Sequence, residues 1–305
     1  MLISEKLKQT NFSPAEASVI AFMFAHPQDL ALLTIKEIAE KTFVHPSTLI
    51  RIAKKLQFSG WKELRDAFTA EQSYLQGYFE QVDANLPFGQ TDGILTIANK
   101  IATLEKTTLA DTLSLLTHDD LAQAKKLLLE AKQIKIFASN AHTLISQDFA
   151  LKMQRIQKPV HVVTTFGESA YEAYNCLPKT CAILISYTGE NKMVQATADI
   201  LAQQNIPILA ITSIGDNTLA RMSNVALRMT TRERLYSKIG NFTTNTSICY
   251  LLDTLYSCVF ADDYQKNLAH IIKVGAVVDK RPSSSAIMEE VPFTSFQLQD
   301  SFLPN

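Results

Sequence analysis

The stretch TIKEIAEKTFVHPSTLIRIAKKLQFSGWKELRDAF, residues 34–68, decides the fold of the first part of this chain. It predicts two short helices joined by a tight turn, and Pro46 suits the first turn of the second helix because its missing N–H costs nothing there. One face of the second helix is an apolar stripe at helical spacing, formed by Leu49, Ile52, Ala53 and Leu56. The opposite face carries hydroxyls and cations: Ser47, Thr48, Arg51 and Lys55. A helix of this kind can seat its apolar side on a three-helix core and present its polar side to a DNA major groove.

The local charge of this stretch supports DNA contact, although the whole chain has a formal net charge of −1. Between residues 41 and 65 only Glu63 is acidic, against six cations: Lys41, Arg51, Lys54, Lys55, Lys62 and Arg65. A local excess of positive charge is what phosphate binding requires. The alternative is a solvated helix face, which is the commonest role of a charge run. Because turn, polarity and charge agree, the sequence favours DNA binding over that alternative.

Individual roles on this face follow from position. We expect Arg51 to meet a base edge or a phosphate, with Ser47 and Thr48 at the helix N-terminus nearest the groove floor. Lysines toward the end of the helix and beyond it are expected on the DNA backbone: Lys54, Lys55 and Lys62. His45 is a poor N-cap, so we expect it to pack in the turn or to touch a phosphate.

Helix signals complete the first domain. Ser13-Pro14-Ala15-Glu16 combines a Ser N-cap, Pro at the first helical position and Glu at the capping-box position. The segment Thr34–Glu37 repeats the capping box for the next helix. Trp61, the only tryptophan, is expected to anchor the core of this domain.

Length and composition indicate more than one domain. The chain has 305 residues and is 47% hydrophobic, which is enough for two cores. No apolar run approaches the length of a membrane span, and the N-terminus lacks a signal-like segment, so we expect a cytoplasmic protein. The four cysteines show no metal-like spacing and are expected to be core thiols: Cys176, Cys181, Cys249 and Cys258. We therefore expect no metal and no cofactor.

The second half of the chain predicts an α/β domain. Four turn-forming residues mark a hinge or linker after the first domain: Gly77, Pro87, Gly89 and Gly93. Two helices are expected next, at about 94–116 and 119–132. Five apolar or β-branched runs then alternate with helical segments: IKIFA at 134–138, VHVVT at 160–164, CAILIS at 181–186, PILAIT at 207–212 and VALRM at 225–229. Runs without polar alternation indicate strands buried on both faces, and therefore a doubly wound parallel sheet.

We expect four parts along the chain. They are an all-α helix-turn-helix domain at 1–75, a linker with connecting helices at 76–132, the α/β domain at 133–280, and a C-terminal tail at 281–305 that is partly disordered.

The loop Ser186-Tyr187-Thr188-Gly189-Glu190-Asn191 follows the third expected strand. Ligands of parallel sheets bind where strands end and helices begin, because helix N-termini present free N–H groups. Ser186 and Thr188 offer hydroxyls, Gly189 permits a close backbone approach, and Asn191 can cap the next helix. This composition suits a phosphoryl group. An ordinary strand-to-helix turn uses the same residue types, so both interpretations stay open at this point.

Taken together, the two halves resemble the RpiR-type bacterial transcription regulators, which join a helix-turn-helix domain to a sugar-isomerase (SIS) domain. The resemblance covers about residues 1–280. It is carried by VHPSTLIRIAKKLQFSGWKELR, similar to the family's recognition helix and following turn, by QDFALKMQRI, and by ISYTGENKMV, similar to its phosphate loop. It implies that a phosphorylated sugar or related metabolite binds the SIS domain and alters operator binding, and that the protein is a dimer or tetramer.

The departures from the family pattern concern the effector pocket. The family's phosphate loop usually reads Ser-x-Ser-Gly-x-Thr, whereas here Thr188 and Asn191 replace the second serine and the threonine. His142 stands at the place of a phosphate-binding serine, and Thr244-Asn245 replaces a Ser-Arg pair, which removes a basic contact. Glu233 matches an acidic position near the sugar, with a solvated loop as the alternative. The resemblance implies these effector contacts: Ser139, His142, Ser186, Thr188, Gly189, Asn191 and Glu233.

The sequence thus predicts a DNA-binding transcription regulator controlled by a phosphorylated sugar or a similar small anion, and not an enzyme. Two copies would read an inverted-repeat operator in double-stranded DNA. The alternative is a phosphosugar isomerase with an accessory helical domain, in which His142 and Glu233 act as acid and base. An isomerase gains nothing from a basic helix that fits a DNA groove, so the regulator is the favoured hypothesis.

Overall fold

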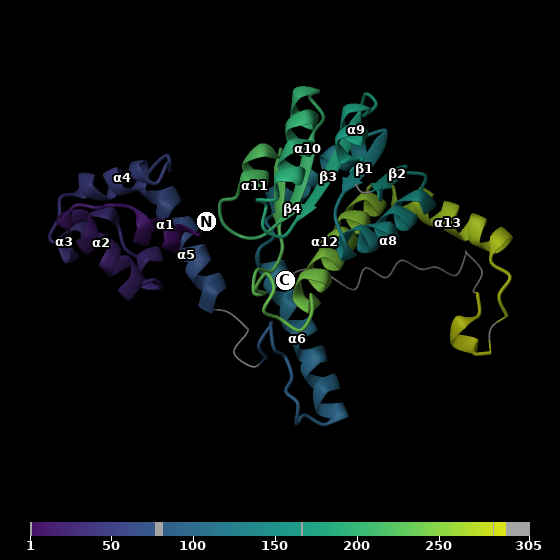
Figure 1. The fold of residues 1–305 in the computed structure, drawn as a ribbon, viewed down its shortest axis with the longest axis horizontal. Helices are drawn as coiled ribbons and strands as arrows, with labels where there is room; N and C mark the ends of the chain where they lie inside the picture. Colours follow the sequence, from purple (N-terminus) through teal and green to yellow (C-terminus); the bar gives the residue numbers. More distant parts are fainter. Residues whose placement is uncertain (1, 77–81, 166, 283, 291–305) are drawn as a thin grey trace.

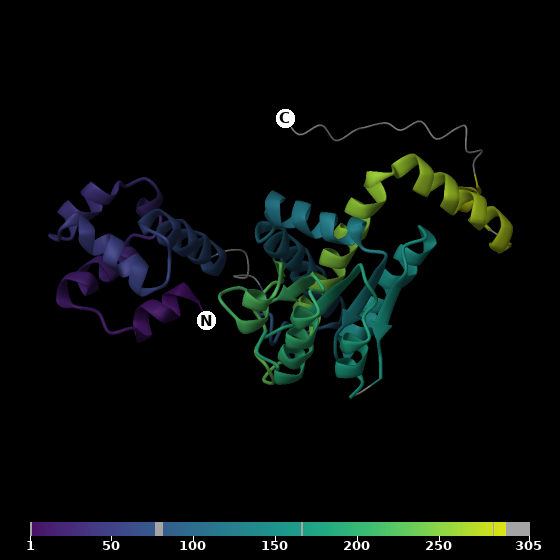
Figure 2. The ribbon, with the colours of Figure 1, turned by 90° about the horizontal axis from the view of Figure 1, so that it is seen from above.

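The computed structural model describes residues 2–76, 82–165, 167–282 and 284–290, and these form a helical lobe and an α/β lobe (Figure 1). The two lobes lie side by side in both ribbon views, with the long helix α5 of the helical lobe directed toward the α/β lobe (Figures 1 and 2). The expected hinge residue Gly77 and the tail from residue 291 lie outside the described residues.

The helical lobe has the predicted helix-turn-helix arrangement. Its elements are α1 (Ile3–Gln9), α2 (Pro14–Ala25), the 3-10 turn η1 (Asp29–Ala31), α3 (Ile35–Lys41), α4 (Pro46–Lys55) and α5 (Trp61–Gln76). One cluster of apolar side chains holds them together, including Met23, Ile38, Leu49, Ile52 and Phe68. Trp61 belongs to this cluster and is 2% exposed, which confirms its predicted role as a core anchor.

The caps of these helices follow the sequence signals, with one exception. Ser13 with Glu16 and Thr34 with Glu37 form the two predicted capping boxes. His45, expected to be a poor N-cap, is in fact the N-cap of α4, and its Nδ1 accepts a hydrogen bond of 3.3 Å from the backbone N–H of Ser47. The sequence interpretation failed here because an imidazole nitrogen can replace the usual hydroxyl or carboxylate acceptor.

The α/β lobe contains the predicted parallel sheet. Its strands are β1 (Gln133–Phe137), β2 (Val160–Val163), β3 (Thr180–Ser186), β4 (Ile208–Thr212) and β5 (Val225–Arg228). They lie in the order β2-β1-β3-β4-β5, and every neighbouring pair is parallel. The central strands β3 and β4 are buried along their whole length, as their unbroken apolar runs predicted. The doubly wound fold is confirmed.

Helices cover both faces of this sheet, as the ribbon shows (Figure 1). The main core joins one face of the strands to α7 (His118–Glu130), α8 (Ala141–Arg155) and α12 (Phe242–Asp262). A second cluster joins the other face to α9 (Ser169–Tyr174), α10 (Lys192–Gln203) and α11 (Thr218–Met222). The remaining elements are α6 (Ile94–Ser114), α13 (Tyr264–Val278) and the 3-10 turn η2 (Ala286–Met288).

The helices expected as connectors are structural parts of the α/β lobe. Leu128 of α7 is fully buried in the main core, and α6 packs against α12. All four cysteines are free thiols, but only Cys181 is buried and Cys249 is exposed, so the expectation of core thiols is right for Cys181 and wrong for Cys249. Among the helices of the described residues, none combines the length and apolarity needed to span a membrane.

Candidate DNA interface and effector pocket

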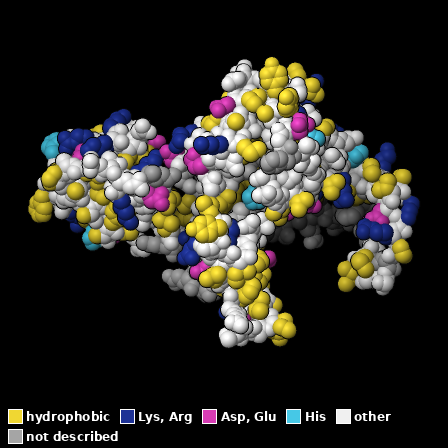
Figure 3. All heavy atoms as spheres, viewed as in Figure 1, with side chains coloured by type: hydrophobic (Ala, Val, Ile, Leu, Met, Phe, Trp, Pro, Cys, Tyr) yellow, Lys and Arg dark blue, Asp and Glu magenta, His cyan; other side chains and the backbone are white. Residues whose placement is uncertain are grey.

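The polar face of α4 is exposed in this structure. His45, Ser47, Arg51, Lys54 and Lys55 are exposed, and Lys62 at the start of α5 is exposed as well. Lys and Arg side chains gather over α4 in the space-filling view (Figure 3). The structure therefore brings most of the predicted DNA-contacting residues onto one surface of the helical lobe.

Thr48 is the exception on this face. It is 4% exposed and packs with the buried residues of α4, so the expectation that it lies at the groove floor is wrong. The physical reason is that Thr48 borders the apolar stripe, and its methyl group allows it to pack inward while its neighbour Ser47 faces solvent.

Glu16 has a second role besides the capping role that the sequence predicts, because its carboxylate lies behind α4. Glu16 of α2 accepts hydrogen bonds from Arg51 Nε at 3.2 Å and from Lys55 Nζ at 2.9 Å. Glu16 itself is 2% exposed, and the backbone N–H of Ser13 donates to it at 2.8 Å. This backbone hydrogen bond and the Lys55 ammonium lower the pKa of Glu16 to about 2 against the opposing effect of burial. No local spacing signals this contact, because Glu16 precedes the two cations by more than thirty residues.

The predicted effector loops meet at the switch point of the sheet. Strand β1 pairs with β2 on one side and with β3 on the other, so the chain leaves β1 and β3 toward opposite faces. The carboxyl ends of these two parallel strands adjoin, since Phe137 pairs with Leu184. In open parallel sheets this crevice is where ligands bind. It brings Ser139, in the loop after β1, and His142, in the first turn of α8, next to the loop from Ser186 to Asn191.

The loop after β3 is ordered by its own hydrogen bonds. Thr188 Oγ1 accepts from the backbone N–H of Glu190 at 3.2 Å, and Asn191 Oδ1 accepts from that of Met193 at 2.9 Å to cap α10. Gly189 has a positive φ of 66°, and a Cβ at this position would collide with the side-chain amide of Asn217. The close approach that glycine permits is therefore used by Asn217 of this chain. Ser186, at the end of β3, is 7% exposed.

The carboxylate of Glu233 is occupied by partners within the chain. Its side chain is 0% exposed and accepts hydrogen bonds from the backbone N–H groups of Thr243 and Thr244, at 2.7 and 3.1 Å, and from both hydroxyls. It thereby caps the N-terminus of α12, where the N-cap residue supplies no side-chain bond. The expectation that Glu233 contacts an effector disagrees with this burial, and so does the alternative of a solvated loop.

A basic group, Lys238, lies beside the loop after β3. Its Nζ donates to Glu233 Oε2 at 2.7 Å. The same atom lies 5.6 Å from the ring centre of Tyr187, which is a residue of the loop after β3. Burial lowers the pKa of the His142 imidazole, and the nearby Lys238 ammonium lowers it further against the opposing effect of Glu233. Lys238 is therefore close to Tyr187 and acts electrostatically on His142. Sequence reasoning missed it because it sits in an irregular segment between β5 and α12.

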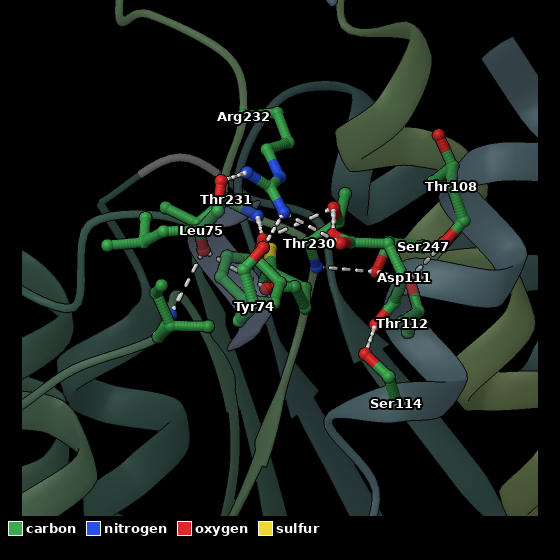
Figure 4. A network of polar contacts seen from close by, with 12 residues as sticks. Tyr74, Leu75, Thr108, Asp111, Thr112, Ser114, Thr230, Thr231, Arg232 and Ser247 are labelled. Atoms are coloured by element: carbon green, nitrogen blue, oxygen red, sulfur yellow. Dashed lines mark hydrogen bonds and ion pairs between the residues drawn. The ribbon is translucent and has the colours of Figure 1, made fainter. Parts of the chain in front are cut away.

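A polar network joins the end of α5 to the α/β lobe (Figure 4). Arg232 forms an ion pair of 3.0 Å with Asp111 of α6, donates to the backbone carbonyl of Tyr74, and stacks 4.1 Å from the Tyr74 ring centre. The Tyr74 hydroxyl accepts a hydrogen bond of 2.6 Å from the backbone N–H of Thr231, and Thr230 Oγ1 donates to Asp111. Burial and the Asp111 carboxylate raise the pKa of Tyr74 to about 12. The last helix of the helical lobe is thus fixed beside Glu233.

A second connection runs from α1. Lys6 Nζ donates to Asp216 at 2.6 Å, and Asp216 also pairs with Arg221 at 2.6 Å. Asp216 lies in the loop that contacts the effector loop, because Glu190 accepts a hydrogen bond of 2.8 Å from the backbone N–H of Thr218. Both connections therefore lead from the helical lobe to residues that border the crevice.

Comparison with known proteins agrees with this two-part architecture. Residues 1–74 match the model of the helix-turn-helix domain of the rpiR family, and residues 127–257 match that of the SIS domain. The chain belongs to the RpiR-type transcriptional regulators.

Two proteins similar to this RpiR-type regulator span almost its whole length. It is 20% identical over 272 residues to an uncharacterised HTH-type transcriptional regulator from Caldanaerobacter subterraneus subsp. tengcongensis, covering 89% of this chain and 94% of that protein. Among solved structures, NanR of Vibrio vulnificus in complex with ManNAc-6P aligns with a TM-score of 0.56 and 20% identity, over 90% of this chain and 97% of NanR. The sugar isomerase domain of an RpiR transcription factor from Sphaerobacter thermophilus aligns with a TM-score of 0.52 and 16% identity, over 59% of this chain and 98% of that domain.

Proposed function

We propose that this RpiR-type regulator binds operator DNA through the exposed face of α4 and that a phosphorylated sugar, or a related anionic metabolite, at the β1/β3 crevice controls that binding. The observation that carries the proposal is the presence, in one chain, of an exposed cationic helix face and of a largely buried lysine, Lys238, beside the loop after β3.

On DNA, the residues of α4 divide by chemistry. Arg51 is assigned to a base edge or a phosphate, and Ser47 to the groove near the helix N-terminus, with the exposed His45 beside it on a phosphate. The lysines are assigned to the DNA backbone: Lys54, Lys55 and Lys62. This arrangement predicts strong salt dependence of binding, since each phosphate contact releases counterions.

In the crevice, Lys238 supplies the positive charge for an anionic effector. Glu233 takes one of the three donors of the ammonium, and the other two suit phosphate oxygens. Ser139, Thr188 and the backbone at Gly189 add hydrogen-bond donors. His142 contributes as a neutral imidazole, because its lowered pKa favours the uncharged ring. Ser186 and Asn191 shape the loop, and Asn191 does so as the cap of α10.

Coupling between the sites follows the two connections between the lobes. Tyr187 of the effector loop donates through its hydroxyl to the backbone carbonyl of Glu233 at 2.7 Å, next to Arg232. Arg232 in turn holds Tyr74 of α5. A ligand that moves the loop after β3 therefore acts on the anchor of the helical lobe. Coupling of this kind is typically worth about 1–3 kcal/mol.

We propose no catalytic activity. Isomerisation of a sugar phosphate needs an acid and a base at the substrate. The Glu233 carboxylate is occupied by the N-terminus of α12 and by Lys238, which leaves His142 without the partner that an isomerase would require. Incubation with aldose and ketose phosphates, followed by NMR, tests this statement, and any interconversion above a no-protein control would contradict it.

We further propose that the regulator acts as a homodimer or a higher homo-oligomer. No residue of helix α13 is fully buried in its own chain, and Val277 and Val278 on it are 71% and 70% exposed. An apolar helix face of this kind suits association between copies. Two copies of α4 about 34 Å apart would then read an inverted repeat. Sedimentation analysis of the full chain tests the association.

Calorimetry tests the effector site. The full-length protein is titrated with N-acetylmannosamine 6-phosphate, with a panel of other sugar phosphates and with the unphosphorylated sugars. Binding is expected only for phosphorylated compounds, and Lys238→Met and Thr188→Ala should each weaken it about tenfold or more, in line with the loss of a charge-assisted hydrogen bond. Lys126→Met, which removes an exposed lysine of α7, is the matched control. Equal binding by wild type and both pocket variants would place the effector elsewhere.

A further inference from the structure

We infer that Glu16 is a positioning residue for DNA recognition, because it holds Arg51 and Lys55 of α4 in the orientation in which they meet DNA. This inference rests on the proposed function, in which α4 is the DNA-reading helix. Glu16 itself touches no DNA in this account, since its side chain is 3% exposed behind the helix.

The geometry of Arg51 supports a positioning role. Only its Nε hydrogen bonds to Glu16, and its side chain remains 61% exposed. Within the described residues its two terminal amino groups have no hydrogen-bonding partner. When Nε is held in this way, the outer edge of the guanidinium, formed by its two terminal amino groups, is directed away from the holding carboxylate. These are the groups that pair in bidentate fashion with guanine or a phosphate.

Lys55 is held by the same carboxylate from the next turn of α4. Its ammonium donates to Glu16 and to the backbone carbonyl of Asn11, at 2.9 and 3.0 Å, and lies 5.0 Å from the ring centre of Phe12. These contacts join α4 to the segment that precedes α2. One buried carboxylate thus orders two long side chains on the DNA-facing surface before DNA arrives. The conformational entropy of these side chains is then already lost in the free protein and does not weaken DNA binding.

Simple electrostatics makes the opposite prediction, which renders the inference testable. A carboxylate close to the DNA-facing surface repels phosphates, so its removal should strengthen binding to any DNA. A positioning role predicts instead that its removal weakens binding to the preferred sequence while leaving or strengthening non-specific binding. The two accounts differ in the sign of the change.

The chain offers a matched control in Glu37. Glu37 holds the same capping-box position at the start of α3, where it bonds to Thr34, but it is exposed and forms no ion pair with α4 among the described residues. Glu16→Gln and Glu37→Gln therefore each remove one capping carboxylate and one negative charge from the helical lobe. Only the first removes the anchor of Arg51 and Lys55.

The experiment uses the full-length chain and two DNA duplexes: one selected by the wild-type protein from a random-sequence pool, and a scrambled duplex of the same composition. Dissociation constants are measured over a series of salt concentrations. Glu16→Gln is expected to lower the ratio of specific to non-specific affinity about fivefold to tenfold, the size of one good base contact. Glu37→Gln should leave that ratio unchanged.

Two further variants separate positioning from folding. Glu16→Asp keeps the charge but shortens the reach, and it should also lower the ratio. In the background of Arg51→Ala with Lys55→Ala, Glu16→Gln should have no further effect, because the side chains that it positions are gone. A general folding defect would instead persist in that background and appear as a lower unfolding midpoint.

The inference is overturned if Glu16→Gln strengthens binding to both duplexes equally, or if it changes the ratio no more than Glu37→Gln does. If the wild-type chain selects no sequence from the pool, the proposed DNA-binding function fails. If it selects one and the ratio is insensitive to Glu16, only the positioning role fails.

Discussion

The DNA-facing surface and the effector crevice share one kind of ion pair but differ in how far its cations are exposed to solvent. In each region a buried glutamate binds a lysine: Glu16 holds Lys55 at 2.9 Å, and Glu233 holds Lys238 at 2.7 Å. In the helical lobe the side chains of Arg51 and Lys55 are 61% and 39% exposed, whereas that of Lys238 is 12% exposed. A surface that must reach a large polyanion keeps its charges outside. A pocket for a small anion keeps its charge inside, where the lower dielectric constant strengthens its electrostatic interactions.

The largest effect should come from the crevice. Glu233→Gln leaves Lys238 without its buried partner and weakens the cap of α12, so we expect a loss of about 3–5 kcal/mol in the free energy of unfolding. Chemical denaturation of the α/β lobe measures this. The exposed Glu168, at the start of α9, is the control, and Glu168→Gln should change stability by less than about 0.5 kcal/mol. An unchanged midpoint for Glu233→Gln would remove the contrast between the two regions.

On the DNA-facing surface the corresponding change should affect binding and spare the fold. Arg51→Ala removes an exposed guanidinium, so we expect a loss of about 1–3 kcal/mol in affinity for operator DNA, with little change in unfolding. Gel-shift titration and thermal unfolding measure the two quantities. Lys126→Ala, on the surface of α7, should alter neither. If Arg51→Ala leaves affinity and salt dependence intact, α4 is not the reading helix.

A smaller effect is expected at the start of α4. His45→Ala removes the acceptor for the backbone N–H of Ser47 and should lower the stability of the helical lobe by about 0.5–1 kcal/mol. His45→Ser should restore it, because a hydroxyl is the more usual N-cap acceptor. The measurement is the unfolding midpoint of both variants, and equal midpoints for His45→Ala and wild type would argue against the cap.

The smallest effect should be that of pH near neutrality. The pKa of Glu16 falls from 4.5 to about 2 on folding, so the stabilisation from its ionised form is complete above pH 4.5 and is lost as the pH falls toward 2. The difference in unfolding free energy between wild type and Glu16→Gln should therefore be constant from about pH 5 to 8 and shrink only in acid. A difference that changes between pH 6 and 8 would show that another group titrates with it.

The helical lobe could be predicted from sequence more fully than the pocket. Caps, turns and helix faces depend on residues a few positions apart, and the capping box of Ser13 and Glu16 was read correctly for that reason. The same logic misplaced Thr48, because a residue at the border of two faces can turn either way. It also missed the second use of Glu16, since its contact with Arg51 spans 35 positions.

The sheet was predicted because buried parallel strands are continuous apolar runs, and its order places the expected loops together. The roles of individual residues in the crevice were not predicted, because they depend on which side chains fill the space between its loops. Glu233 was expected at the ligand and caps α12 in this structure, while Lys238, in a segment without periodicity, lies beside Tyr187. The assignment of effector contacts stays a prediction until ligand binding is measured.

The burial of Trp61 gives the molecule an internal reporter. It is the only tryptophan in the chain and lies in the core of the helical lobe, so indole fluorescence originates entirely from the half that faces DNA. A metabolite that enters the other half can change that emission only if the two halves communicate. A simple emission spectrum, recorded while sugar phosphate is added, therefore observes transmission between them without any attached dye.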